Sequence, residues 1–142
     1  MKKVGKQENQ KVLFDRVSYR CSKSVTNTYS TSFSLAIRFL HKDFVEPIHG
    51  IYGFVRFADE IVDSFHDFQK KELLERFKNE TYTAIDEGIS LNPILNSFQF
   101  VVNEFGIERE LIDRFLHSME MDLRQEEYTQ ERYEEYILGS AE

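Results

Sequence analysis

Four residues near the middle of the chain have types and spacing that suit the binding of a phosphorylated ligand. Tyr52, Arg56, Asp59 and Asp63 are separated by steps of four, three and four residues, so in a helix they form one narrow stripe. Two carboxylates one turn apart can share a hard divalent cation such as Mg²⁺, which keeps coordination positions for phosphate oxygens. The arginine one turn earlier adds a planar donor fork for the same phosphate. The spacing therefore predicts a magnesium and phosphate site on a helix.

A solvated helix face is the alternative interpretation of this stripe. Amphipathic surface helices carry charges opposite their apolar side, and Arg56 and Asp59 could form an ordinary surface ion pair. The stripe contains no lysine and begins with a tyrosine. These two details favour a ligand site, and both interpretations stay open on spacing alone.

A cluster of hydroxyl side chains lies ahead of this helix, at Ser30, Thr31 and Ser32. Free backbone N–H groups and the positive end of the helix dipole favour a phosphate where a helix begins. A plain N-cap by one of the serines explains the same residues. The cluster is therefore a second candidate for phosphate contact.

Length, composition and charge limit the class of protein. The chain has 142 residues, 41% of them hydrophobic, which is enough for one globular domain with a real core. Its net charge of −7 argues against nucleic acid as a partner. The single Cys21 cannot form an internal disulfide, and no signal peptide or membrane-spanning run is visible. We therefore expect a cytoplasmic protein, with peripheral membrane contact left open.

Apolar residues recur at helical spacing along most of the chain, and no alternating strand pattern competes. The prediction is an all-α fold of about six or seven helices, with residues 1–10 as a flexible tail and residues 11–142 as the helical domain. Residues 22–32 are rich in Ser and Thr, and residues 29–33 predict a break, with Ser30 or Ser32 able to cap the helix that follows. Pro47 suits the first turn of the helix that carries the stripe. The other predicted helices cover residues 11–21, 34–44, 69–88, 94–105, 108–127 and 130–142.

Three segments together resemble the head-to-head trans-isoprenyl diphosphate synthases, the squalene and phytoene synthase family. Residues 29–33 resemble its Ser-x-Ser-Phe phosphate-contact segment, and residues 51–63 resemble its first aspartate-rich motif, Tyr-x-x-x-Arg-x-x-Asp-(Asp/Glu)-x-x-Asp. Residues 119–122 and 133–141 resemble its Met-x-x-Asp and Tyr-x-x-Gly-x-Ala helices. The resemblance covers residues 19–142 and is strongest to bacterial phytoene synthases.

This resemblance implies an isoprenoid synthase-type helix bundle and Mg²⁺-dependent joining of two prenyl diphosphates, such as geranylgeranyl diphosphate to phytoene in carotenoid biosynthesis. It implies that Asp59 and Asp63 hold Mg²⁺, and that Asp59, Asp63, Tyr52 and Arg56 form the catalytic set. Tyr29 stands where many relatives have histidine. The implied diphosphate contacts are Tyr29, Ser30, Thr31, Ser32, Tyr52 and Arg56, and the implied cavity residues are Phe33, Asp122 and Tyr136.

The sequence also departs from the family pattern, because no second aspartate pair follows Tyr136. We therefore expect an N-terminal portion of a truncated bundle, inactive alone and self-associating through exposed helix faces. A non-catalytic helical interaction module with a solvated acidic face is the alternative. Head-to-tail chain elongation is disfavoured, because the motif lacks the paired leading aspartates of that group. Prenyl chain length and product do not follow from the sequence.

Overall fold

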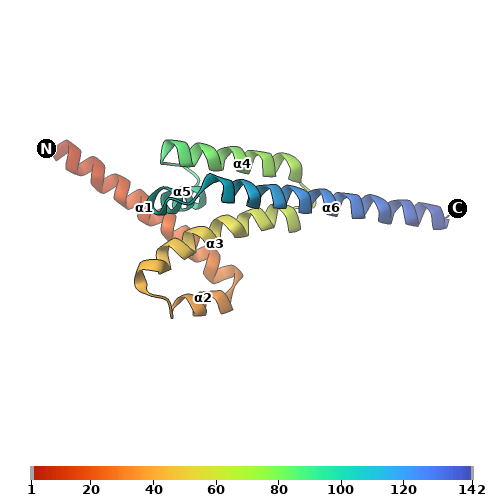
Figure 1. Cartoon of the computed structure of the whole chain (residues 1–142), viewed down its shortest axis with the longest axis horizontal. Coiled ribbons are helices and arrows are strands. Elements are labelled where there is room, and N and C mark those ends of the chain that lie inside the picture. The colour runs from red at the N-terminus through yellow and green to blue at the C-terminus, as the bar shows by residue number, and fades with distance from the viewer. Residues whose placement is uncertain (1, 142) are drawn as a thin grey trace.

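The chain folds as a bundle of helices. The computed structural model describes the backbone of residues 2–141 and the side chains of residues 9–135, 137 and 138. Over that backbone the chain forms six helices and no strand, which confirms the all-α prediction (Figure 1). The helices are α1 Lys2–Tyr29, α2 Thr31–Ile37, α3 Lys42–Asp63, α4 Lys70–Glu87, α5 Pro93–Phe105 and α6 Arg109–Ala141.

Helix α4 ends, and helix α5 begins and ends, where local signals in the sequence predict. Gly88 ends α4 with a φ of 73°, and Gly106 ends α5 with a φ of 65°, a backbone conformation that favours glycine. The side chain of Asn92 accepts hydrogen bonds from two backbone N–H groups at the start of α5, and Pro93 is its first residue. Local chemistry therefore explains the end of α4 and both ends of α5.

The predicted break at residues 29–33 is confirmed, because α1 ends at Tyr29 and Ser30 caps α2, which begins at Thr31. The Ser- and Thr-containing residues 22–28 ahead of this break lie in α1. Residues 2–10, expected as a tail, lie in the same helix. The small residues Ser18, Ser22 and Thr26 repeat every four positions and are fully buried. The hydroxyls of Ser18 and Thr26 donate to carbonyl oxygens one turn earlier, so burial leaves these two groups satisfied. The hydroxyl-rich segment is therefore a packing surface within α1.

Three other predicted boundaries are wrong. The predicted helix 34–44 is instead α2, which ends at Ile37, followed by a turn before α3. Helix α3 begins at Lys42, so Pro47 lies in its second turn. The two helices predicted over residues 108–127 and 130–142 are one helix, α6. No glycine or proline separates those two segments, so nothing in the chain stops α6 there.

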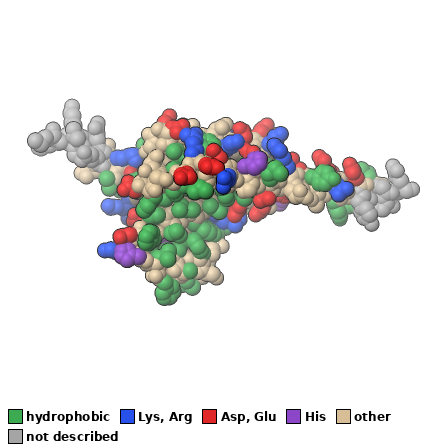
Figure 2. All heavy atoms as spheres, in the orientation of Figure 1, with side chains coloured by type: hydrophobic (Ala, Val, Ile, Leu, Met, Phe, Trp, Pro, Cys, Tyr) green, Lys and Arg blue, Asp and Glu red, His purple; other side chains and the backbone are tan. Residues whose placement is uncertain are grey.

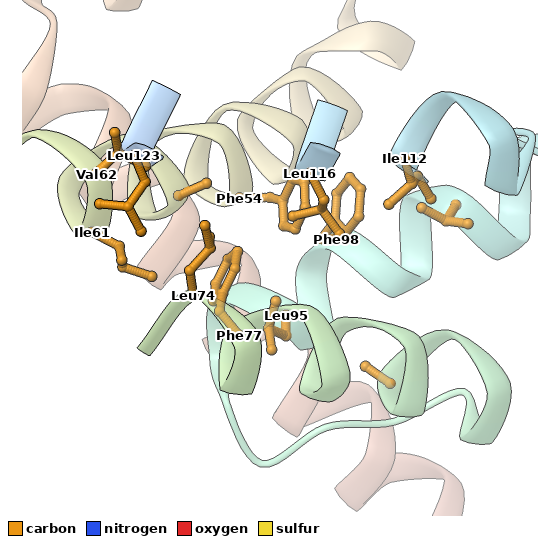
Figure 3. Close-up of a cluster of buried hydrophobic side chains, with 13 residues drawn as sticks. Phe54, Ile61, Val62, Leu74, Phe77, Leu95, Phe98, Ile112, Leu116 and Leu123 are labelled. Carbon is orange, nitrogen blue, oxygen red and sulfur yellow. The ribbon is translucent and has the colours of Figure 1, made fainter. Parts of the chain in front are cut away.

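The core forms where the apolar side of α3 meets α4, α5 and α6 (Figure 3). The ring of Phe54, which is 2% exposed, stacks on the ring of Phe98 with a centroid distance of 3.8 Å. Phe77 and Phe115 also contact the Phe54 ring. The other buried members are Ala58, Ile61, Val62, Leu74, Ala84, Leu95, Val102, Ile112, Leu116 and Leu123. The C-terminal part of α6 extends past the other helices (Figure 1).

Large apolar side chains also lie on the surface. Figure 2 shows them gathered where Figure 1 places α2 and the start of α3. Phe39, in the turn between these helices, is 91% exposed, and Leu35, Leu40 and Phe44 are exposed beside it in the sequence. Within the described part of the chain, no helix is both long and apolar enough to cross a membrane.

Candidate diphosphate site on helix α3

Helix α3 carries the predicted stripe on the side opposite its core residues. Tyr52, Arg56 and Asp59 are half-buried, and Asp63 is exposed at the last turn. The end of α1 and the start of α2 flank this stripe on one side, because Tyr29 contacts Arg56 and Phe33 contacts Tyr52. The fold therefore assembles the first two motifs of the sequence into one surface region.

The carboxylate of Asp59 lies in an unfavourable electrostatic environment. Burial raises the pKa of Asp59, the charges of Asp63 and Asp122 raise it further, and the charge of Arg56 opposes them. The influence of Asp122 shows that α6 brings this carboxylate into electrostatic range of α3, although the Asp122 side chain is exposed. Three negative charges therefore act on one another with incomplete compensation, as expected where a cation binds.

Arg56 forms two contacts within the protein. Its guanidinium pairs with the carboxylate of Glu60 one turn later, and it lies 4.9 Å from the ring centroid of Tyr29. Burial disfavours the charge on Arg56, but the hydrogen bond and charge of Glu60, with smaller contributions from Asp59 and Tyr52, outweigh burial and raise the pKa of Arg56. The arginine is therefore a fixed positive charge beside Asp59.

The hydroxyl cluster divides into a cap and two exposed side chains. Ser30 is the N-cap of α2, and its Oγ accepts a hydrogen bond of 3.1 Å from the backbone N–H of Phe33. Thr31 and Ser32 are exposed in the first turn of α2. The ring of Phe33 stacks on Tyr52 with a centroid distance of 5.0 Å. The structure thus gives Ser30 the capping role that was the alternative to phosphate contact.

Two further features adjoin the stripe. Tyr29 and Glu60 line a cleft of about 350 Å³, whose other walls are mostly apolar side chains of α3 and α4. Sequence reasoning assigned no role to Glu60, although its position four residues after Arg56 is the spacing of a helical ion pair.

The predicted cavity residue Tyr136 lies outside the described side chains.

The carboxylates suit a cation that arrives with phosphate. No three His, Cys, Asp or Glu side chains among the described residues are placed to hold a metal by themselves. Asp59 and Asp63 nevertheless supply two oxygen donors one turn apart, and Mg²⁺ commonly binds one or two carboxylates together with substrate phosphates. The donor set fits Mg²⁺ on these terms, with the diphosphate completing the coordination.

Comparison with known proteins identifies the class to which this fold and site belong. A sequence profile of the squalene/phytoene synthases matches residues 26–142, so the chain belongs to the squalene/phytoene synthase family. This family consists of prenyltransferases of isoprenoid biosynthesis that act on prenyl diphosphates. The family match confirms the resemblance of the three sequence segments to this family.

Among curated proteins, the chain is similar to the presqualene diphosphate synthase of Rhodopseudomonas palustris (strain ATCC BAA-98 / CGA009). The two sequences are 29% identical over 93 residues, which are 66% of this chain and 33% of that protein. The match therefore spans about a third of the length of that relative.

Proposed function

We propose that this chain carries the first diphosphate-binding region of a Mg²⁺-dependent head-to-head prenyl synthase. The reaction joins two prenyl diphosphates, and the resemblance to bacterial phytoene synthases favours geranylgeranyl diphosphate as substrate and phytoene as product. The observation that carries the proposal is the group Arg56, Asp59 and Asp63, which lies on one helix within the residues that match the family. A fixed positive charge and an under-compensated carboxylate pair are the complement of a magnesium diphosphate.

Each residue of the stripe has a role in this proposal. When bound, Mg²⁺ would supply the positive charge that makes the diphosphate a better leaving group. Asp59 and Asp63 hold that ion, and Arg56 directs its donors to the phosphate oxygens. Tyr52, supported by the stacked ring of Phe33, lies one turn before Arg56 and borders the same ligand. Asp122 adds negative charge near Asp59, which strengthens the attraction for a cation.

The 142 residues alone should bind a diphosphate without completing the reaction. The sequence holds one match to the aspartate-rich motif, whereas joining two prenyl diphosphates requires two leaving groups to be controlled. We infer that the chain binds diphosphate without turnover, and that its exposed helix faces promote self-association in the cytoplasm. Peripheral contact with a membrane surface is the other use of the same apolar side chains. Phytoene formed from geranylgeranyl diphosphate and Mg²⁺ at a normal rate would contradict the inactivity.

A thermal-shift experiment tests the diphosphate site. Pyrophosphate with MgCl₂ should raise the melting temperature, because a ligand that binds only the folded state stabilises it. The double variant Asp59→Asn with Asp63→Asn should lose the increase. The matched control is Asp86→Asn with Glu104→Gln, which removes the same number of charges from α4 and α5 and should keep it. No shift in the parent protein would favour the non-catalytic interaction module instead.

A further inference from the structure

Arg56 is restrained from two directions before any ligand arrives. The carboxylate of Glu60 pairs with one terminal nitrogen of the guanidinium, and the ring of Tyr29 lies against the guanidinium carbon at 4.9 Å. The Arg56 side chain is only 25% exposed, and the Glu60 side chain 15%. The Nε of Arg56 is buried and has no hydrogen-bond partner. The Tyr29 ring therefore restrains the flat face of the guanidinium, and Glu60 restrains one edge. Such restraint suits an arginine that presents its donor fork to a ligand in a defined orientation.

Tyr29 reaches this position because of how the chain turns. It is the last residue of α1, and Ser30 immediately caps α2, so the chain changes direction directly after the tyrosine. Tyr29 is 48% exposed, and its ring contacts the guanidinium of Arg56 on α3. A cation over the face of an aromatic ring is attracted by the electron density of that face, and this attraction needs no hydroxyl group.

We propose that Tyr29 is a positioning residue whose ring face orients the Arg56 guanidinium for a diphosphate, rather than a residue whose hydroxyl binds phosphate. This inference rests on the proposed function of the stripe. An arginine loses much side-chain freedom when it becomes fixed, and a contact that fixes it in advance strengthens ligand binding. The ring alone is sufficient for this role, so phenylalanine should replace Tyr29 and an aliphatic residue of similar size should not.

Binding of pyrophosphate in the presence of MgCl₂, measured by titration calorimetry on the 142-residue chain, tests the proposal. The variant Tyr29→Phe should bind within about twofold of the parent, and Tyr29→Leu should bind about fivefold more weakly, as expected from the loss of one partly exposed cation–π contact. Equal weakening in both variants would overturn the proposal, because it would assign the effect to the hydroxyl. Parent-like binding by Tyr29→Leu would also overturn it.

A double-mutant cycle decides whether Tyr29 acts through Arg56. In an Arg56→Gln background, which has no cation to place on the ring, Tyr29→Leu should change pyrophosphate affinity by less than about twofold. Independent losses that simply add would contradict the inference. The melting temperature of each variant without ligand shows whether a loss of affinity merely reflects unfolding.

A measurement without ligand separates this inference from the proposed function. The ring current of Tyr29 should shift the side-chain NMR signals of Arg56, and Tyr29→Phe should keep the shift while Tyr29→Leu abolishes it. If the parent fails to bind pyrophosphate but the Arg56 signals show the expected ring-current shifts, the diphosphate function is wrong. The contact between Tyr29 and Arg56 then exists without a ligand to serve, and the positioning role is wrong as well. If the parent binds pyrophosphate but the Arg56 signals show no ring-current shift from Tyr29, the positioning role is wrong and the diphosphate function stands.

Discussion

The two sides of α3 differ in burial and charge, and therefore in what they contribute to the protein. On the core side, Phe54, Ala58 and Val62 are almost fully buried and uncharged. On the stripe side, Arg56 and Asp59 are half-buried and Asp63 is exposed. The first side lowers the free energy of the folded state by removing apolar area from water. The second side holds like charges near one another, which is useful for binding a ligand and contributes little to stability.

The largest effect is expected on the core side, from Phe54→Ala. The Phe54 ring contacts three other aromatic rings, Phe77, Phe98 and Phe115, so its removal leaves a cavity among residues of α4, α5 and α6. The free energy of unfolding should fall by about 3–5 kcal/mol, a large share of the stability of a single domain. Denaturant unfolding followed by circular dichroism measures the change.

Two comparisons sharpen this result. Phe54→Leu keeps most of the volume and should cost clearly less than Phe54→Ala. Arg56→Ala on the stripe side should cost less than Phe54→Ala, because its ion pair and its ring contact are partly exposed. If Arg56→Ala destabilised the fold as much as Phe54→Ala, the division of α3 into a stabilising side and a binding side would be wrong.

Much of this architecture follows from local patterns in the sequence. Apolar spacing together with Gly88, Asn92 and Gly106 was enough to place α4 and α5, since stop and cap signals act within one turn. The failures lie where tertiary contacts decide. Ser22 and Thr26 lie beyond the predicted helix 11–21, yet they belong to α1, because the packing of α1 on its neighbours favours small buried side chains there.

The candidate site divides in the same way. The stripe from Tyr52 to Asp63 depends only on helical spacing and was predictable. The contact of Tyr29 with Arg56 depends on how the chain turns between α1 and α2, which no local pattern specifies. The approach of Asp122 to Asp59 joins residues on different helices, and only the family resemblance indicated it. Non-local contacts are the part that the sequence pattern leaves undetermined.

A smaller effect is expected from His49, a buried titratable group that faces α1 from α3. Its Nδ1 lies 2.9 Å from the hydroxyl of Thr26, and the residue is 3% exposed. Burial lowers the pKa of His49, and the positive charge of Lys23 lowers it further. The unfolded chain then binds a proton more readily than the folded one, so stability is complete above the ordinary histidine pKa of about 6.5 and declines as pH falls below it.

The free energy of unfolding should therefore decrease between pH 7.5 and pH 5.5, by at most about 1.4 kcal/mol for each pH unit. The melting temperature, which is the quantity measured, should decrease with it. The variant His49→Gln should flatten this dependence. The matched control is His117→Gln, because His117 is exposed on α6, and it should leave the slope unchanged. A slope that survives His49→Gln would assign the pH dependence to other groups.

The smallest effect, and the one of opposite sign, is expected from Asp59→Asn. Burial and the nearby charges of Asp63 and Asp122 raise the pKa of Asp59, so the folded chain binds a proton more readily than the unfolded chain. The ionised carboxylate therefore reduces stability at neutral pH, and this cost disappears as pH falls through the raised pKa toward the ordinary aspartate value of about 4. Asparagine removes the charge and should increase stability at pH 7 by no more than about 1 kcal/mol.

The pH dependence and the ligand together make this last prediction specific to the stripe. The gain from Asp59→Asn should vanish near pH 4, and Asp63→Asn, at an exposed position, should give a smaller gain. With Mg²⁺ and pyrophosphate at pH 7, the parent should become more stable than Asp59→Asn. The bound cation stabilises the ionised carboxylate of the parent, and the variant offers the cation one carboxylate fewer. If Asp59→Asn lowered stability at pH 7 without ligand, the stripe would be a stabilising ion-pair surface, and both sides of α3 would stabilise the fold.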